Sequence, residues 1–200
     1  MKTAPTLVVL AAGFGTRYKG ARHKLDEPLH GSTVLGCTLR NAVASQLPLV
    51  LVTTPAFVAA AVEVAAMRDI VVISLAEASR GMGHSIAAGV SMRADASGWL
   101  VLPGDMPMVR ADTIRAVAAA LDKHPVVYAQ YRGRRGHPVG FGAELYSELV
   151  SLTGDEGARR IVARYPVHGE ELDDPGVLVD VDTQDDLAAL AALATPSGAY

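Results

Sequence analysis

Short runs of β-branched and leucine residues alternate with alanine-rich stretches along almost the whole chain, and this alternation restricts the fold more than any other feature. We expect strands at residues 6–10, 49–53, 70–74, 99–102, 126–130 and 177–181. Most of these runs are continuously apolar, which is the pattern of a strand buried on both faces. We expect helices at residues 34–45, 55–68, 84–93, 111–123, 155–164 and 183–193. The alternation predicts an α/β protein with a mostly parallel central sheet and helices on both faces.

The composition is that of a globular chain without a large excess of either charge. Of its 200 residues 50% are hydrophobic, which excludes a disordered protein, and the formal net charge is −3. A chain of this length predicts one domain, which we place at residues 1–194, with a loose tail at residues 195–200. A net charge near zero argues against a nucleic acid as partner.

The cysteine content and the N-terminal segment indicate the compartment. The single cysteine, Cys37, excludes an internal disulfide and a CxxC motif, and we expect it to be buried in a reduced protein. The apolar segment before the first glycine-rich stretch is too short for a signal peptide or a membrane span. We therefore expect a cytoplasmic protein that does not bind membranes.

A glycine-rich loop, Leu10-Ala-Ala-Gly-Phe-Gly-Thr-Arg17, directly follows the first expected strand. Gly13 and Gly15 allow a tight turn whose N–H groups can approach a ligand closely. Cationic side chains follow within a few residues, at Arg17, Lys19, Arg22, His23 and Lys24. Backbone donors and fixed positive charge are what a triphosphate requires, so we favour a triphosphate site over a solvated surface loop.

Two common phosphate-binding motifs do not fit this loop. A Walker motif needs a lysine after its second glycine, but Gly20 is followed by Ala21. A dinucleotide fingerprint that starts at Gly13 would need a third glycine where Tyr18 stands. It also needs a carboxylate for the ribose, and no acidic residue lies between Glu27 and Glu63. These differences argue against NAD in its usual binding mode.

Three aspartates follow expected strands and are candidates for metal binding. Asp105 ends an apolar run between Gly104 and a proline turn, where an unpaired buried charge would be too costly. It needs a metal, a cation or water, and Mg²⁺ held by one or two carboxylates and substrate phosphates is the usual arrangement in phosphoryl chemistry. Asp180 and Asp182 share one face of the last expected strand, so either could complete the site.

Each of these aspartates also has a purely structural interpretation. Asp105 could cap the helix expected from Ala111, although it stands early for that position. Asp182 could serve only to start the last helix, next to its positive end. That helix opens with a capping-box pattern at Thr183 and Asp186.

Two further segments are candidates for substrate contacts. Ser85 lies at the start of a helix of small residues, after flexible glycines, where it could approach a nucleobase or sugar or merely cap the helix. Residues 132–138 interrupt the regular alternation with three arginines, two glycines and His137. This excursion could form a wall of the site or an ordinary exposed turn.

Taken together, these motifs resemble the MobA-like NTP transferases, in the branch of molybdenum cofactor cytidylyltransferases. The resemblance covers residues 6–190 and rests on the order of several modest motifs. These are Leu10-Ala-Ala-Gly-x-Gly-Thr-Arg17, Lys24, Gly83-His-Ser85, Gly104-Asp-Met-Pro107, Gly136-His-Pro138, Gly154-Asp-Glu-Gly-Ala-Arg159 and Asp180-Val-Asp-Thr183. Leu-Ala-Ala-Gly, instead of Leu-Ala-Gly-Gly, is more similar to the cytidylyl branch than to the guanylyl branch. The resemblance implies a three-layer Rossmann-like nucleotidyltransferase fold.

The resemblance also implies roles for individual residues. It assigns catalysis to Arg17, Lys24 and Asp105, metal binding to Asp105 and Asp182, and acceptor binding to Gly136, His137 and Pro138. The implied nucleotide-binding residues are Leu10, Ala11, Ala12, Gly13, Gly15, Thr16, Arg17, Lys24 and Ser85. The family commonly has Arg-Met-Gly-x-x-Lys, whereas the segment from Arg17 to Lys24 is longer here. Lys19 or Arg22 could therefore take part of the role of Lys24, and whether Asp180 or Asp182 binds the metal stays open.

The implied activity is a Mg²⁺-dependent transfer of NMP from an NTP, with CTP expected, to a phosphorylated acceptor, with release of pyrophosphate. The expected acceptor is molybdopterin or the molybdenum cofactor, and a molybdoenzyme is a possible protein partner. The alternatives are a transferase of the same fold that acts on a sugar phosphate or alditol phosphate, and a non-catalytic accessory protein that binds a nucleotide or cofactor for a molybdoenzyme. A redox enzyme is disfavoured because the ribose carboxylate is missing.

Overall fold

A seven-stranded sheet forms the centre of the protein in the computed structural model, which describes residues 3–193. Its strand order is β5-β4-β1-β6-β8-β7-β9. The strands are β1 Thr6–Ala11, β4 Leu49–Thr53, β5 Ile70–Val72, β6 Gly98–Pro103, β7 Val126–Tyr131, β8 Arg134–Gly142 and β9 Val167–Glu171. Two short strands, β2 Pro28–Leu29 and β3 Ser32–Thr33, pair separately. The expected tail at residues 195–200 lies outside the described residues.

β1 is an inner strand of the sheet and is parallel to both of its neighbours, β4 and β6. Its residues Leu7, Val8 and Val9 are completely buried, because alternate side chains enter the hydrophobic cores on opposite faces of the sheet. The continuous apolar pattern is thus explained by burial on both faces. β8 is the exception to the parallel arrangement, since it runs antiparallel to β6 and β7.

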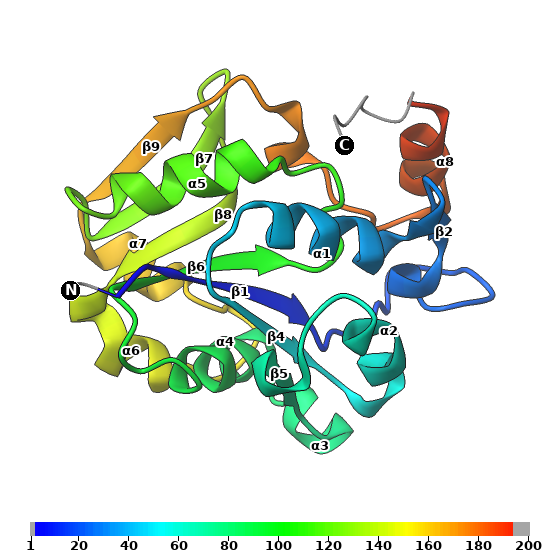
Figure 1. Ribbon diagram of the computed structural model, residues 1–200, viewed down its shortest axis with the longest axis horizontal. Helices are drawn as coiled ribbons and strands as arrows, with labels where there is room; N and C mark the ends of the chain where they lie inside the picture. The colour runs from blue at the N-terminus through cyan, green and yellow to red at the C-terminus, as the bar shows by residue number, and fades with distance from the viewer. Residues whose placement is uncertain (1–2, 194–200) are drawn as a thin grey trace.

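Helices cover both faces of the sheet, so the expected three-layer α/β architecture with a mostly parallel sheet is confirmed (Figure 1). One face packs against α1 Val34–Ala44, α2 Val58–Val62, α5 Ala111–Ala120 and α8 Gln184–Ala192. The other face packs against α3 Leu75–Ala78, α4 Met82–Ser91, α6 Tyr146–Val150 and α7 Arg159–Arg164. Short 3₁₀ helices connect these elements: η1 Lys24–Asp26, η2 Pro55–Phe57, η3 Met67–Asp69, η4 Ala143–Leu145 and η5 Pro175–Leu178. No helix among the described residues is long and apolar enough to cross a membrane.

Most expected elements lie where the sequence pattern places them, but the helix expected at residues 55–68 is broken. It is replaced by η2, α2 and η3, and only Phe57, Ala61 and Ala65 of this stretch are buried. Val62 and Met67 are exposed, so the segment has little apolar contact with the sheet. Short helices depend on tertiary packing for stability, which explains why a longer helix does not form here.

The strand expected at residues 177–181 is wrong. This segment is η5 followed by an irregular stretch, and the last strand of the sheet is β9. Val177 and Val181 are completely buried, so the segment is apolar because it packs into the core as a loop. β9 is polar and partly buried at the edge of the sheet, and its sequence therefore lacks the apolar pattern of the inner strands.

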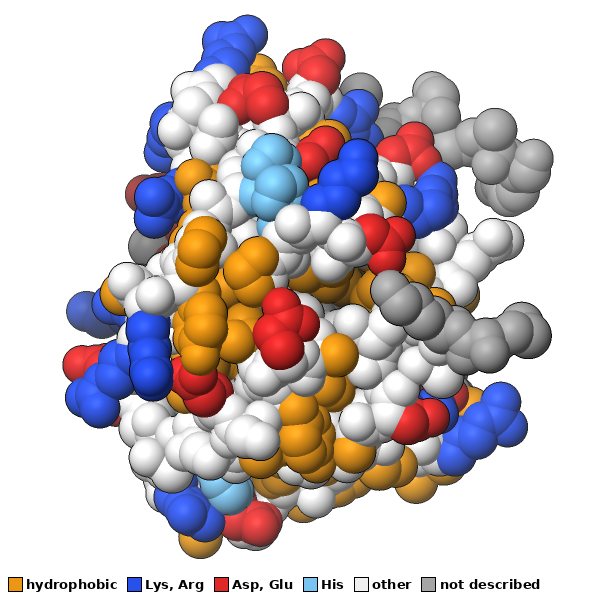
Figure 2. Space-filling model, turned by 90° about the vertical axis from the view of Figure 1, so that its left-hand side faces the viewer, with side chains coloured by type: hydrophobic (Ala, Val, Ile, Leu, Met, Phe, Trp, Pro, Cys, Tyr) orange, Lys and Arg blue, Asp and Glu red, His pale blue; other side chains and the backbone are white. Residues whose placement is uncertain are grey.

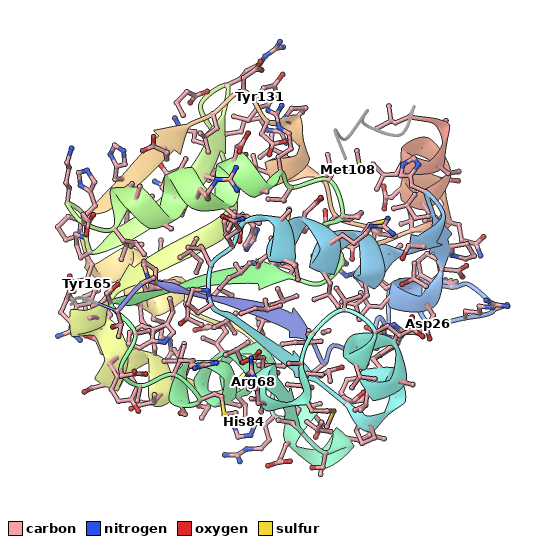
Figure 3. The ribbon with its side chains drawn as sticks, viewed as in Figure 1. Asp26, Arg68, His84, Met108, Tyr131 and Tyr165 are labelled. Atoms are coloured by element: carbon pink, nitrogen blue, oxygen red, sulfur yellow. The ribbon has the colours of Figure 1, made fainter. Side chains whose placement is uncertain are left out.

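The arginine-rich excursion at residues 132–138 is the turn and the first half of β8 in a β7–β8 hairpin. Arg132 and Gly133 form the turn with positive φ values of 49° and 74°. Tyr131, at the end of β7, marks this turn at the top of Figure 3. Gly136 and Pro138 concealed the strand in the sequence, because both residue types are uncommon within strands.

Candidate active site

The glycine-rich loop leaves the sheet at the carboxyl end of β1, where ligands of open parallel sheets usually bind. Gly15 has a φ of +59°, a conformation that favours glycine. In the described part of the chain, the N–H groups of residues 13–16 have no acceptor. The N–H of Gly104 donates to the carbonyl of Leu10 at 2.8 Å and holds the turn after β6 against this loop.

Lys24 and two aspartates form the centre of the site. The Lys24 Nζ atom lies 2.5 Å from Asp105 Oδ2 and 2.9 Å from Asp182 Oδ1. Arg17 Nη1 lies 2.6 Å from Asp182 Oδ2, although its own side chain is largely exposed. Lys24 is only 9% exposed, because η1 places it beneath the loop and against the carboxylates. In Figure 3, Asp26 marks this end of the sheet and Tyr165 marks the opposite end.

This geometry argues against the capping interpretations of the aspartates. The N-cap of α5 is Arg110, so Asp105 does not cap that helix. The N-cap of α8 is Thr183, which forms the expected capping box with Asp186. The carboxylate of Asp182 instead faces Lys24 and Arg17.

The carboxylates and the lysine influence one another's protonation. Burial lowers the pKa of Lys24, but the charges and hydrogen bonds of Asp105 and Asp182 outweigh burial and raise it above its usual value. Partial burial, followed by the negative charges of Asp182 and Asp105, raises the pKa of Asp180. Negative charge therefore exceeds what Lys24 alone compensates at this site.

Three carboxylates lie close enough to share a metal ion. One oxygen atom from each of Asp105, Asp180 and Asp182 lies within 4.8 Å of the other two. Asp105 Oδ1 is buried and has no hydrogen-bond partner, which is costly unless a ligand satisfies it. A set of carboxylate oxygens suits Mg²⁺ or Mn²⁺. The donor set therefore fits the metal that the sequence motifs imply.

Polar groups from α1 hold the turn that carries Asp105. Thr38 Oγ1 donates to the Gly104 carbonyl at 2.9 Å, and Asn41 Nδ2 donates to the Pro107 carbonyl at 2.9 Å. Val181 N–H donates to the Asp105 carbonyl at 3.0 Å and brings the segment of Asp180 and Asp182 alongside. The sequence analysis missed Thr38 and Asn41, whose only signal is a polar residue on an otherwise apolar helix.

Asp174 is a second residue that the sequence analysis missed. It is 2% exposed, and it accepts hydrogen bonds from the N–H groups of Arg110 and Gly176 and from Thr113 Oγ1. These bonds fasten the start of η5 to the start of α5, and η5 leads directly to Asp180. Asp174 is therefore a structural anchor of the carboxylate cluster.

A cavity of about 720 Å³ adjoins Asp105 and Asp180. It extends from the carboxylates along β8 to α4 and α7, with an apolar lining that includes Ile86, Val139 and Phe141. Four arginines contribute to its walls, namely Arg17, Arg134, Arg135 and Arg159. Within residues 3–193, Arg134, Arg135 and Arg159 form no ion pair, whereas the neighbouring Arg160 pairs with Glu156.

The expected acceptor residues border this cavity. Gly136 and His137 line it, and His137 precedes Pro138 through a cis peptide bond. Burial lowers the pKa of His137, an effect that the negative charge of Asp105 partly opposes. The imidazole is therefore neutral at pH 7 and can offer both a donor and an acceptor to a ligand.

The other residues expected at the site differ in burial and in their contacts. Ser85 is 6% exposed on α4, the helix that packs against β1 and β4 and whose residues Met82 and Ile86 line the cavity. Lys19 and Arg22 are exposed, and of the cationic residues after Arg17 only Lys24 contacts the carboxylates. Cys37 is buried, as expected.

A second hollow lies at the opposite end of the sheet. It is lined by residues of both charges, including Asp95, Lys123 and Glu144. Figure 2 views the molecule from this side and shows acidic, basic and hydrophobic side chains interspersed. None of the candidate site residues lies there.

A glycine-rich loop, a lysine and carboxylates at the end of a mostly parallel sheet define the class of α/β proteins that bind nucleoside phosphates. Comparison with known proteins identifies the family, since the model of the MobA-like NTP transferase domain matches residues 7–169. The chain belongs to this family, and thus to the nucleotidyltransferase superfamily.

The similarity to known proteins covers most of the chain. Purine catabolism protein PucB of Bacillus subtilis is 30% identical over 193 residues, which cover 90% of this chain and 92% of that protein. The crystal structure of Rv0371c from Mycobacterium tuberculosis is 30% identical, with a TM-score of 0.81 over 96% of this chain and 100% of that chain. Rv0371c has also been solved in complex with manganese, with a TM-score of 0.77 over 94% of this chain and 98% of that chain. The bifunctional protein GlmU of Alkalilimnicola ehrlichii is 34% identical over 61% of this chain but only 26% of its own length.

Proposed function

We propose that this protein transfers CMP from CTP to a phosphorylated acceptor, molybdopterin or the molybdenum cofactor, in a Mg²⁺-dependent reaction that releases pyrophosphate. The observation that carries the proposal is the contact of Lys24 with Asp105 and Asp182 beside a loop with open N–H groups. The family and the similarity to PucB and to the manganese-bound Rv0371c support it. The expected cytidylyl branch rests on Leu10-Ala-Ala-Gly in the glycine-rich loop.

The nucleotide would bind at the glycine-rich loop. The N–H groups of residues 13–16 would donate to phosphate oxygens, and Arg17 would add positive charge from the side. Lys24 would exchange its carboxylate contacts for contacts with the triphosphate. Ser85 would lie toward the base or ribose.

Asp105 would hold Mg²⁺ together with Asp182 or Asp180. When bound, the ion neutralises charge on the phosphates and favours in-line geometry. The unpartnered Asp105 Oδ1 atom supports a metal-binding role for this residue. Lys24 and Arg17 would compensate the remaining charge of the triphosphate and of the leaving pyrophosphate.

The acceptor would occupy the cavity next to Asp105. Arg134, Arg135 and Arg159 provide unpaired positive charge there, and the apolar lining suits a large organic body. Neutral His137 would hydrogen-bond the acceptor from β8.

The chemistry is an in-line substitution at the α-phosphorus atom of the NTP. An oxygen atom of the acceptor phosphate forms the new P–O bond, and the bond from the α-phosphorus to the β-phosphate oxygen breaks with its electrons leaving on pyrophosphate. The attacking phosphate is already ionised, so no general base is needed. The protein contributes position and charge compensation, which are the main sources of catalysis in such reactions.

A transfer assay with CTP, GTP, ATP and UTP, each with Mg²⁺, tests the proposal against molybdopterin, a sugar phosphate and an alditol phosphate. We expect pyrophosphate release with CTP and molybdopterin. Asp105→Asn should lower kcat/KM by about a hundredfold or more, while the exposed control Asp122→Asn leaves it unchanged. A preference for GTP would exclude the cytidylyl branch, transfer to a sugar phosphate would favour the alternative acceptor, and binding without turnover would indicate an accessory protein.

Adjacent arginines on α7 test the acceptor cavity. Arg159 lines the cavity, whereas Arg160, which pairs with Glu156, does not. Arg159→Ala should raise the KM for the acceptor roughly tenfold, as expected for the loss of a charged hydrogen bond, with little change in the KM for CTP. Arg160→Ala should change neither constant. An equal effect of the two substitutions on the acceptor KM would contradict this placement.

A further inference from the structure

His23 joins the glycine-rich loop to the helix that carries Lys24. Its Nδ1 atom accepts a hydrogen bond from the N–H of Leu25 at 3.2 Å and so caps η1. Its Nε2 atom lies 3.0 Å from the carbonyl oxygen of Gly13. One imidazole ring therefore connects the two parts of the site that the proposed function assigns to the triphosphate.

These two contacts determine the tautomer of His23. A backbone N–H can only donate, so Nδ1 must present its lone pair to Leu25. A carbonyl can only accept, so Nε2 must carry the proton that it donates to Gly13. The neutral Nε2–H tautomer satisfies both contacts, and the opposite tautomer satisfies neither.

The ring is also wedged in place by packing. Its centroid lies 4.7 Å from that of buried Phe57, the last residue of η2, with an interplanar angle of 58°. On the other side it lies against Gly15, where a Cβ atom would come within 3.0 Å of Nε2. Gly15 thus serves two purposes, a positive φ and room for the histidine.

We propose that His23 is a positioning residue that aligns the glycine-rich loop with Lys24 before the nucleotide binds. This inference rests on the proposed function for what binds there. The carbonyl of Gly13 is turned toward His23, and in a planar trans peptide the N–H of Phe14 then points to the opposite side, free for a phosphate oxygen. The cap on η1 in turn holds the backbone of Lys24, whose side chain reaches the carboxylates.

Two substitutions separate the two hydrogen bonds. The Oδ1 atom of an asparagine is as many bonds from Cβ as Nδ1 of histidine, so His23→Asn can keep the cap but cannot reach Gly13. The Nε2 atom of a glutamine is as many bonds from Cβ as Nε2 of histidine, so His23→Gln can keep the bond to Gly13 but loses the ring acceptor for Leu25. His23→Ala removes both, and His124→Gln, at the far end of the sheet, is the matched control.

For each variant, the Kd for CTP with Mg²⁺ is measured by calorimetric titration, together with kcat and the melting temperature. We expect His23→Ala to raise the Kd about tenfold, which corresponds to about 1.4 kcal/mol, and to lower kcat. His23→Asn should mainly raise the Kd through the loop, and His23→Gln should mainly lower kcat through Lys24. A merely structural residue would lower the melting temperature without this division, and that result, or an unchanged Kd in His23→Ala, would overturn the inference.

The tautomer is measured on the nucleotide-free wild-type protein, so this result does not depend on the proposed function. Long-range ¹H–¹⁵N NMR spectra should show protonated Nε2 and unprotonated Nδ1 for His23. The opposite tautomer would overturn the inference even if the protein transfers CMP. Conversely, the expected tautomer and an NTP-binding defect in His23→Ala would support it even if the acceptor proves to be a different phosphate.

Discussion

Lys24 balances the charge of the site in the absence of ligands. Its ammonium group contacts Asp105 and Asp182, two residues that a metal ion would also require. Both carboxylates are less than a fifth exposed, so an unbalanced negative charge at this place would be costly. Lys24 and a metal ion would therefore compete for the same two carboxylates.

The substitution Lys24→Met removes the charge and keeps most of the length of the side chain. We expect the free energy of unfolding of the metal-free protein to fall by about 1–3 kcal/mol, because two partly buried carboxylates lose a partner. Added Mn²⁺ should then raise the melting temperature more in Lys24→Met than in the wild type. The exposed Lys19→Met serves as control, and equal Mn²⁺-induced shifts in all three proteins would contradict the competition.

β8 connects the cavity with the carboxylate cluster through a close backbone approach. A Cβ atom at Gly136 would lie 2.2 Å from the carbonyl oxygen of Val177, which belongs to η5. Only glycine allows this distance, and it brings the segment of Asp180 and Asp182 against the strand. The antiparallel strand and the loop thus position each other.

Gly136→Ala tests this contact. We expect a loss of about 1–3 kcal/mol in the free energy of unfolding, as for an overpacked core, together with weaker Mn²⁺ binding because the carboxylates move apart. Gly13→Ala is the matched comparison for stability, since its Cβ would meet no atom within 4 Å. If thermal unfolding of Gly136→Ala is unchanged, the strand does not support the cluster as described.

Ligands should stabilise the entire fold, because the site joins the loop after β1, the turn after β6 and the segment after η5. Binding at a concentration of about 100 times the Kd adds roughly 2.7 kcal/mol to the free energy of unfolding. For a chain of this size that corresponds to a rise of about 5–10 °C in melting temperature. We expect this shift with CTP and Mg²⁺ together, measured by differential scanning calorimetry.

A chelator alone should leave the melting temperature unchanged, because Lys24 already compensates two of the carboxylates. A large loss of stability on chelation would show that the metal is a structural part of the fold. That outcome would contradict the role assigned to Lys24 and would leave the nucleotide-dependent shift as a separate question.

The sequence by itself determined the buried strands, most helices and the segments of the site. Continuous apolar runs predict strands such as β1 and β6, because burial on both faces leaves a local pattern. The same reasoning failed at residues 177–181, which are apolar because they pack into the core as a loop. It also failed at β9, whose polar sequence lies at the edge of the sheet. Local patterns report burial, and burial alone does not distinguish a strand from a buried loop.

Only the tertiary structure decided which residues meet. Lys24 lies 81 residues from Asp105 and 158 residues from Asp182, and no local pattern encodes such a contact. The sequence left open which of Lys19, Arg22 and Lys24 contacts phosphate. The structure shows that, of these three, Lys24 is the one buried against the carboxylates. The sequence placed His23 only among the cationic side chains after the loop, and Asp174 went unrecognised. The contacts of both residues with backbone groups become visible only when the loops have folded against each other. The physical reason is that the sequence specifies each element through local preferences, whereas chemistry at the site depends on distances across the sheet.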